Sequence, residues 1–394
     1  MKYYFVLGTN TALSAAELEA AIVWENPRLL APDFLLAEVK EDFQAERLIS
    51  RLGGTIKIGR IGAIIKSGDD RRLLGAVAEM AAQKQGRNPE GKFNFGFSDY
   101  GKRYFNKKDL GIKLKKFFQE EGLSSRFVVS REKTLSSVVV AQNRLLTRGI
   151  EIVLAGDGDD ILIGETLAVQ PFKDLSLRDF GRPARDDRSG MLPPKLAQIM
   201  INLAGPLTDE AVIIDPFCGS GTVLTEALLL GYKNIFGSDI SPEAIAATRK
   251  NISWVRELYK ILAPETRLFE KKAQQLSKFI KPESIDAVIT EPYLGPQRGR
   301  IDFAAIIKEL EDLYSASLAE FLKILKPRGR VVMVWPLYYG ERPISPDYSG
   351  FNMRNVIPDE LRRNPFVRSS NRGTIVYGRS GQKVFREIVV LDKE

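Results

Sequence analysis

The chain has 394 residues, of which 44% are hydrophobic and 27% charged, so its composition is that of a globular protein with two or three domains. It contains no histidine and a single cysteine, which excludes histidine bases, Ser-His-Asp triads and internal disulfides and argues against a zinc site. No targeting segment is visible and no apolar stretch approaches the roughly 18 residues of a membrane span, so we expect a cytoplasmic protein without membrane contact.

Residues 1–90 alternate between strand-like and helix-like patterns. Ser14 is followed three residues later by Glu17, a capping box that predicts a helix with Ser14 as its N-cap. The other predicted elements are the strands Tyr3–Leu7 and Phe34–Val39 and the helices Ala45–Leu52 and Arg72–Gln83. The segment is therefore predicted to form a small α+β piece.

Residues 91–170 carry most of the positive charge. Between Gly91 and Ile150 there are 13 Lys or Arg and 5 Asp or Glu residues, an excess equal to the net charge of the whole chain, +8. A clustered basic region is typical of a nucleic-acid surface, and a merely solvated basic face is the alternative. The candidate RNA contacts are Lys102, Arg103, Lys107, Lys108, Arg126 and Lys133. The predicted elements are the helix Asp109–Glu121 and the strands Asn94–Phe97, Phe127–Ser130, Ser137–Ala141, Glu151–Leu154 and Ile161–Glu165.

Residues 171–190 are polar, which predicts a linker. A helix is expected to begin at Pro193-Pro194, because proline is tolerated in the first turn. From Ala211 onward, apolar strands alternate with glycine loops and helices, the pattern of a doubly wound α/β domain. The charged residues of the linker are Arg178, Asp179, Arg182, Arg185, Asp186, Asp187 and Arg188.

A glycine-containing loop follows the first strand of this domain. The apolar run Ala211–Ile214 leads into Asp215-Pro216-Phe217-Cys218-Gly219-Ser220-Gly221-Thr222. Ligands of open α/β sheets bind beyond the carboxyl ends of strands, where glycines allow a close approach. The pattern matches neither the dinucleotide fingerprint nor the phosphate loop. Because Asp215 would repel phosphate, a ligand with an ammonium and a sulfonium group fits better.

A second acid, Asp239, ends the next apolar strand, Asn234–Ser238. It lies 24 residues after Asp215, and an acid at about 20 residues beyond a glycine loop commonly accepts hydrogen bonds from ribose hydroxyls. The alternative is that Asp239 caps the helix expected from Ser241. The neighbouring glycine loop favours the ribose role.

A third acid, Glu291, follows the predicted strand Asp286–Thr290 and precedes Pro292 and Tyr293. Glu291 would stand at the carboxyl edge of the sheet, near the bound ligand. Its carboxylate and the carbonyl oxygen of Pro292 can accept two N–H bonds, and the ring of Tyr293 can stack on a planar base. The alternative is an ordinary turn at the end of a strand.

These motifs together resemble those of class I S-adenosylmethionine-dependent methyltransferases. The Asp215–Thr222 loop resembles motif I, Asp239 the acid of motif II, and Glu291-Pro292-Tyr293 the catalytic motif IV of amino-methyltransferases. Motif IV here has Glu instead of Asp or Asn and a single proline, and Lys272-Ala273 replaces the usual Asp-Ala of motif III. The resemblance implies a Rossmann-like domain, S-adenosylmethionine as cofactor and no metal. The cofactor contacts that it implies are Asp215, Phe217, Gly219, Gly221, Thr222, Asp239, Ile240 and Ala273.

The first 165 residues resemble an α+β arrangement of a ferredoxin-like piece and a THUMP domain, which grips the acceptor end of tRNA. The residues that carry this resemblance are Phe95-Gly96-Phe97-Ser98, Lys113–Phe118, Arg126, Leu135–Val139 and Ile163–Thr166. The junction at Arg178–Pro183 and Pro194–Ala197 resembles THUMP-linked tRNA guanine N2-methyltransferases of the position-10 type. We expect a ferredoxin-like subdomain at 1–90, a THUMP RNA-binding domain at 91–170, a linker at 171–190 and a methyltransferase domain at 191–394.

The resemblance implies an enzyme that transfers a methyl group to the exocyclic N2 amine of a guanine in tRNA, at position 10. Glu291 and the Pro292 carbonyl would hold the amine while Tyr293 stacks on the flipped base. One alternative is a methyltransferase of the same fold that acts on another tRNA or rRNA site. The other is a THUMP-type RNA-binding module whose methylation site has decayed. The expected partner is tRNA, and the sequence does not exclude a small activator protein.

Overall fold

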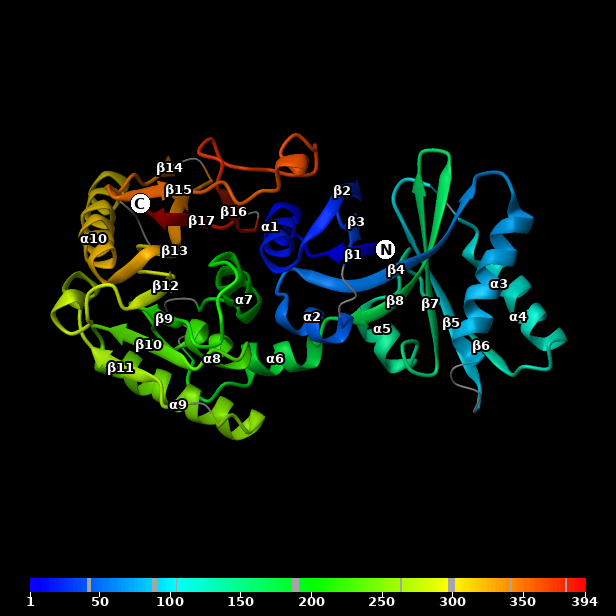
Figure 1. The fold of residues 1–394 in the computed structure, drawn as a ribbon, viewed down its shortest axis with the longest axis horizontal. Coiled ribbons are helices and arrows are strands. Elements are labelled where there is room, and N and C mark those ends of the chain that lie inside the picture. Colours follow the sequence, from blue (N-terminus) through cyan, green and yellow to red (C-terminus); the bar gives the residue numbers. More distant parts are fainter. Residues whose placement is uncertain are drawn as a thin grey trace. The chain divides into compact units, whose positions relative to one another are not determined.

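The computed structural model describes residues 1–40, 44–86, 91–103, 105–185, 191–262, 264–296, 302–340, 342–379 and 381–394. The chain folds into two compact units, whose elements are labelled in Figure 1. The first unit comprises Met1–Thr11, Val23–Phe172 and Asp359–Val367, and the second comprises Ala12–Ile22, Lys173–Pro358 and Arg368–Glu394. Each unit therefore draws on separate stretches of the sequence.

An eight-stranded sheet forms the first unit, with the strand order β2-β3-β1-β4-β8-β7-β5-β6. Its strands are β1 (Lys2–Leu7), β2 (Trp24–Ala31), β3 (Phe34–Val39), β4 (Thr55–Lys66), β5 (Phe93–Tyr100), β6 (Ser125–Val128), β7 (Gly149–Asp157) and β8 (Asp160–Val169). Its helices are α2 (Ala45–Arg51), α3 (Asp70–Gly86), α4 (Lys107–Glu120), α5 (Ser137–Gln142) and the short η2 (Asp359–Leu361). Strands from residues 1–90 and 91–170 share this sheet. The proposed division near residue 90, which itself lies outside the described residues, therefore falls within one unit.

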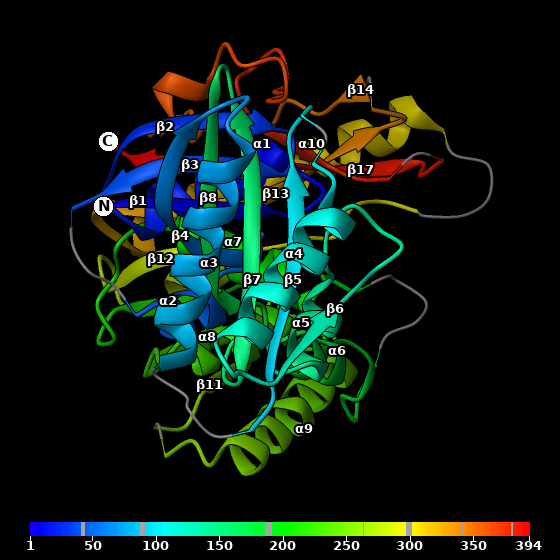
Figure 2. The same cartoon turned by 90° about the vertical axis from the view of Figure 1, so that its right-hand side faces the viewer.

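The central strand β7 is buried on both faces of this sheet over most of its length. Along β7, Ile152 and Leu154 belong to one apolar cluster, together with Leu114 of α4. Val153 lies between them in sequence and belongs to a second cluster, together with Tyr4 of β1. Successive side chains of a strand point to opposite faces, so the two clusters cover the two sides of the sheet. Figure 2 shows α3 and α4 lying in front of β5 and β7.

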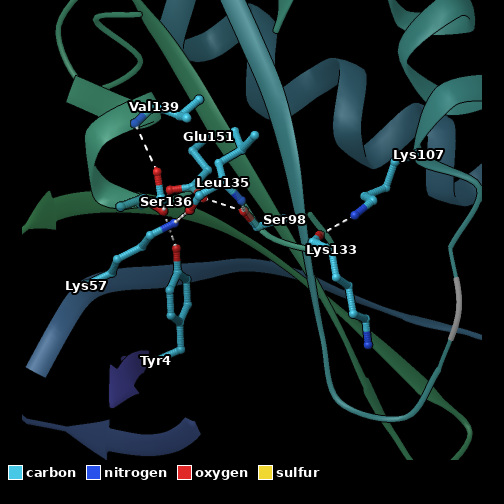
Figure 3. A network of polar contacts seen from close by, with 10 residues as sticks. Tyr4, Lys57, Ser98, Lys107, Lys133, Leu135, Ser136, Val139 and Glu151 are labelled. Carbon is cyan, nitrogen blue, oxygen red and sulfur yellow. Dashed lines mark hydrogen bonds and ion pairs between the residues drawn. The ribbon is translucent and has the colours of Figure 1, made fainter. Parts of the chain in front are cut away.

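A buried ion pair connects the central strands of the first unit (Figure 3). Nζ of Lys57 on β4 donates to Oε1 of Glu151 on β7 at 2.5 Å and to the carbonyl oxygen of Leu135 at 2.6 Å. The carboxylate also accepts from the hydroxyls of Ser98 at 2.5 Å and Thr166 at 2.7 Å. The two charged side chains are 2% and 0% exposed. A buried charge is costly unless it is paired and hydrogen-bonded, so the network fixes four strands and the segment before α5 as one set.

The segment Ser137–Ala141, predicted as a strand, belongs to the helix α5. Oγ of Ser136 accepts a hydrogen bond from the backbone N–H of Val139 at 3.3 Å, which is an N-cap contact. Three consecutive valines favour extended structure by propensity. The strand prediction is wrong because the cap and the anchored carbonyl of Leu135 together outweigh that propensity.

A nine-stranded sheet forms the second unit, with the main order β11-β10-β9-β12-β13-β17-β15. Its strands are β9 (Val212–Asp215), β10 (Asn234–Asp239), β11 (Arg267–Glu270), β12 (Ile285–Thr290), β13 (Leu325–Tyr338), β14 (Arg342–Pro343), β15 (Phe351–Met353), β16 (Ile375–Tyr377) and β17 (Val384–Lys393). Its helices are α1 (Thr11–Ala21), α6 (Phe172–Phe180), α7 (Pro194–Leu203), α8 (Thr222–Leu229), α9 (Pro242–Tyr259), η1 (Ala273–Lys278) and α10 (Phe303–Ile324). The adjacent strands β11, β10, β9, β12 and β13 are parallel to one another. The strand β17 is antiparallel to both β13 and β15. The predicted doubly wound α/β fold is confirmed. Among the described residues, no helix is both long and apolar enough to cross a membrane.

The helix α1 begins at Thr11, three residues before the predicted N-cap Ser14. Ser14 and Glu17 lie inside this helix and are 2% and 0% exposed. Oε1 of Glu17 accepts a hydrogen bond from Nδ2 of Asn202 in α7 at 2.8 Å. The predicted capping box is wrong because the glutamate has a tertiary partner, and the helix starts before either residue.

The first half of the predicted linker is helical and packed. α6 contains Arg178, which is only 5% exposed. Its Nε donates to Oε1 of Glu226 in α8 at 2.8 Å, and its Nη2 donates to Oε2 at 3.1 Å. A two-point pair of this kind fixes the orientation of α6 on α8. Three of the predicted linker charges lie outside the described residues: Asp186, Asp187 and Arg188.

Lys57→Met should destabilise the first unit by about 3–5 kcal/mol, because it leaves Glu151 buried without its cation. Hydrogen–deuterium exchange of peptides from β5, β7 and β8 measures this destabilisation as faster exchange. Lys57→Met/Glu151→Leu should recover most of the stability, since no charge is left unpaired. Lys40→Met, which removes only an exposed ion pair with Glu25, is the control and should leave exchange unchanged. Exchange in Lys57→Met that equals the control would contradict the assignment.

Candidate active site

A cleft of about 1320 Å³ lies in the second unit, beyond the carboxyl ends of β9, β10 and β12. Parallel strands end at the same edge of a sheet, so the acids that end or follow these strands, Asp215, Asp239 and Glu291, come together. The predicted site residues that line the cleft are Asp215, Phe217, Gly219, Thr222, Asp239, Ile240, Ala273, Glu291, Pro292 and Tyr293. Gly221 is not among the residues that line it.

The two loop glycines have different surroundings. Gly219 has a φ of +51°, and a Cβ built on it would meet no atom within 4 Å. Gly221 has a φ of +83°, and a Cβ there would lie 2.9 Å from Cγ2 of Thr248 on α9. Positive φ strains any residue with a side chain, so both positions favour glycine. Gly219 leaves open space beside the cleft, whereas Gly221 allows its turn to pack closely on α9.

Asp215, at the end of β9, is only 2% exposed. Its Oδ1 accepts from Oγ1 of Thr290 at 2.6 Å and from the backbone N–H of Phe217 at 3.1 Å. Burial, together with the charges of Asp239 and Glu291, raises the pKa of Asp215 to about 7. A cation bound in the cleft would therefore favour the ionised form of this carboxyl group.

Backbone N–H groups hold both carboxylate oxygens of Asp239. Oδ2 accepts from Gly219 and Oδ1 accepts from Ser241, each at 2.9 Å. The N-cap of α9 is Ser241, whose Oγ accepts from the N–H of Ala244 at 3.1 Å. The structure therefore gives the capping role to Ser241 and not to Asp239. Each carboxylate oxygen has a second lone-pair site, so Asp239 can still accept hydrogen bonds from ligand hydroxyls.

An apolar wall borders Asp239. The side chain of Ile240 is 63% exposed although it is large and hydrophobic. Ala273 is buried at the start of η1, directly after the exposed Lys272. Both Ile240 and Ala273 line the cleft, and apolar lining of this kind suits a planar ligand.

Two buried tyrosines fix the loop after β12. Oη of Tyr314 on α10 donates to the carbonyl of Tyr293 at 2.8 Å, and Oη of Tyr338 on β13 donates to the carbonyl of Leu294 at 2.9 Å. Gly295 has a φ of +82°, and a Cβ there would lie 2.2 Å from Oη of Tyr338. The loop is therefore held close to β13. The Tyr293 side chain is 51% exposed and lines the cleft, so its ring is available to a ligand.

Glu291 forms a two-point ion pair with Arg386 of β17. Nε of Arg386 donates to Oε2, and Nη2 donates to Oε1 at 3.1 Å. Burial by itself would lower the pKa of Arg386, but Glu291 more than offsets this effect and the pKa is raised. Arg386 was missed in the sequence; the available signal was the charged pair Arg386-Glu387 inside the apolar strand Val384–Leu391.

Residues of the predicted linker also hold the glycine loop. Nη1 of Arg182 donates to Oγ1 of Thr222 at 2.6 Å. Nδ2 of Asn251 on α9 donates to the carbonyls of Ala184 and Ser220, both at 2.8 Å. The N–H of Ala184 donates back to Oδ1 of Asn251 at 2.9 Å. Arg182 belongs to the junction Arg178–Pro183 noted in the sequence, but its contact with Thr222 and the contacts of Asn251 could not be predicted, because each joins residues distant in sequence.

The predicted RNA contacts lie at two ends of the sheet of the first unit. Nζ of Lys133 lies 3.2 Å from Oδ1 of Asp99, near the carboxyl end of β5. Nζ of Lys107 donates a hydrogen bond to the carbonyl oxygen of Lys133, as Figure 3 shows. Arg126 on β6 is instead in register with Asn94, near the amino end of β5. We name the cations gathered after β5 the basic end, which comprises Lys102, Arg103, Lys107, Lys108 and Lys133.

Residues 182–338 match the family model of the RMKL-like methyltransferase domain. A similar curated protein is the tRNA (guanine(10)-N2)-dimethyltransferase of Methanothermobacter thermautotrophicus, 32% identical over 149 residues, which are 38% of this chain and 40% of the relative. The protein of the same name from Methanocaldococcus jannaschii is 31% identical over 150 residues, 37% of this chain and 38% of the relative. The chain thus spans about two fifths of the length of these relatives.

Two further likenesses concern the fold. The ribosomal protein L11 methyltransferase of Acinetobacter baumannii is 31% identical over 112 residues, 28% of this chain and 35% of the relative. Among solved structures, TrmN from Thermus thermophilus is similar over 100% of both chains, with a TM-score of 0.56 and 18% identity. This likeness shows that the chain shares the fold of that structure, and the residues matched by the family model include the strands β9 to β13 of the second unit.

Proposed function

We propose that this protein transfers a methyl group from S-adenosylmethionine to the exocyclic N2 amine of a guanine in tRNA, at position 10, in the cytoplasm. The observation that carries the proposal is the cleft at the carboxyl edge of a methyltransferase sheet, where three acids meet a glycine loop. The amine and its position are suggested by the names of two relatives, both tRNA (guanine(10)-N2)-dimethyltransferases.

The cleft fits S-adenosylmethionine in charge and shape. Asp215 is a buried acid that contacts no cation among the described residues, which suits a ligand with ammonium and sulfonium groups. Asp239 can accept hydrogen bonds from ribose hydroxyls, and the exposed side chain of Ile240 can pack against adenine. The space beside Gly219 admits a ligand close to the backbone. The bound cofactor supplies an electrophilic methyl group on a positively charged sulfur.

The chain itself orients the amine and stabilises its developing charge. We assign one amine N–H to Glu291 and the other to the carbonyl oxygen of Pro292. The amine would receive the methyl group on its nitrogen lone pair and would then release one N–H proton to water, while Glu291 and the Pro292 carbonyl hold the amine in place. Tyr293 stacks on the base, which has to leave its helix to reach the cleft.

The first unit would bind the RNA. We propose that it contains a THUMP-type domain whose basic end contacts tRNA phosphates. In this proposal the boundaries along the whole chain lie near residues 90, 170 and 190. Lys102 and Lys108 are both exposed, which leaves their ammonium groups available to phosphates. Lys107 and Lys133 also bond to the protein backbone, so part of their role is to shape this surface.

The proposed reaction is tested by incubating the protein with bulk tRNA and labelled cofactor, followed by mapping of the labelled nucleotide. We expect N2-methylated guanine at position 10. A label at another tRNA or rRNA nucleotide would favour the first alternative. Cofactor binding without methyl transfer to any RNA would favour the decayed RNA-binding module.

In the same assay, Glu291→Ala should lower single-turnover methylation by about 100- to 1000-fold at saturating tRNA and cofactor, because one preorganised acceptor is removed. Glu291→Gln keeps the shape and one acceptor and should retain more activity. Glu291→Asp keeps the charge but retracts the carboxylate, so its rate reports how strictly the position matters. Turnover near the wild-type rate in Glu291→Ala would refute this role.

Affinity for S-adenosylmethionine should increase as the pH rises through about 7. The pKa of Asp215 is raised to about 7, and the cationic ligand favours its ionised form, so binding near this pH should release a proton. Calorimetry in two buffers of different ionisation enthalpy measures the release. Asp215→Asn should flatten the pH dependence. Proton release that persists in this variant would show that another group is responsible.

Lys102→Ala/Lys108→Ala should weaken tRNA binding and reduce the slope of log affinity against log salt by about 0.7–0.9 for each phosphate group that the variant no longer binds. Fluorescence anisotropy over a salt series measures both effects. Arg126→Ala reports whether the RNA also reaches the amino end of β5. Lys40→Ala, in an exposed pair with Glu25, is the control. An unchanged slope in the double variant would support the merely solvated face.

A further inference from the structure

The ion pair between Glu291 and Arg386 joins two distant parts of the chain at the wall of the cleft. The residues are 95 positions apart, and both line the cleft. Their side chains are 12% and 15% exposed, so water screens the pair only weakly. A guanidinium that engages both carboxylate oxygens restricts rotation of the carboxylate as well as compensating its charge.

The other titratable groups near Glu291 do not supply a positive charge. Asp215 of β9 is an acid that interacts electrostatically with Glu291. Tyr314 of α10 also interacts with Glu291, and burial raises the pKa of this phenol well above its usual value, so it stays neutral. Tyr293, in the same loop, is likewise an uncharged phenol whose pKa burial raises. Among the described residues, Arg386 is the cation in contact with Glu291.

Asp215 lies at the same edge of the sheet and has no cationic partner among the described residues, so its pKa reports the effect of this environment on an unpaired acid. Its carboxyl group is buried beside two other acids and has a pKa of about 7. Glu291 shares this location but faces Arg386 instead of only hydroxyl and amide groups. Removing the guanidinium would leave the Glu291 carboxylate largely buried beside other acids and without its counter-charge, which disfavours the charged form.

We infer that Arg386 is a positioning residue that supplies the counter-charge of Glu291 and aims its carboxylate at the substrate amine. This inference rests on the proposed function. A carboxylate has about four lone-pair sites, and Arg386 uses two of them, so acceptor sites remain for the amine. Glu291 therefore acts as a hydrogen-bond acceptor while the proton released from the amine passes to water.

The test is the pH dependence of single-turnover methylation from about pH 5 to 9, at saturating tRNA and cofactor. Arg386→Met should introduce an acid limb, which is a range at low pH in which the rate falls about tenfold for each unit by which the pH decreases. The reason is that Glu291 becomes protonated in this variant. Arg386→Lys keeps a positive charge and should lack the limb, although its single-point contact lowers the plateau rate. Arg386→Met/Glu291→Gln should also lack the limb, because Gln does not titrate.

Arg379→Met is the matched control, since Arg379 lines the cleft without an ion pair to Glu291 among the described residues, and its profile should keep the wild-type shape. Arg386→Gln replaces Arg386→Met if calorimetry shows that the latter no longer binds cofactor. A wild-type profile in the neutral Arg386 variants, or a limb that persists with Glu291→Gln, would overturn the inference alone. No methylation of any RNA by the wild-type protein would overturn the proposed function and the inference together.

Discussion

The arrangement of the cleft depends on the parallel sheet, which brings three carboxylates to one edge where like charges repel. The chain stabilises each acid differently. Asp215 is buried and bonded to Thr290, Asp239 is held by two backbone N–H groups, and Glu291 is paired with a guanidinium. The three acids therefore line one cleft with different partners, and in the proposed function they would serve a cationic cofactor, its hydroxyls and the substrate amine respectively.

Much of this edge could be predicted from the sequence because its signals are local. Each acid ends or directly follows a short apolar strand, and parallel strands bring their carboxyl ends together whatever the rest of the fold. Arg386 could not be found in this way. It reaches Glu291 only because β17 lies antiparallel beside β13, a pairing between segments distant in sequence. The same reason applies to Asn251, whose loop contacts cross from α9.

Local signals were also misleading where tertiary contacts compete with them. The valines of α5 favour a strand by propensity, but Ser136 caps a helix there. The cations between residues 91 and 150 form one cluster in sequence, whereas the fold places Arg126 near the opposite end of β5 from Lys133. Counting charges therefore identified the unit that carries them but not the end of the sheet at which they gather.

The way the chain is shared between the two units bears on its synthesis. The second unit contains Ala12–Ile22, which leaves the ribosome before almost all of its partners, and the first unit contains Asp359–Val367, which leaves late. Domains usually fold one after another as the nascent chain emerges. Here a ribosome has to translate through residue 367 before the first unit has all its segments, so both units complete their folding in the same late stage of translation.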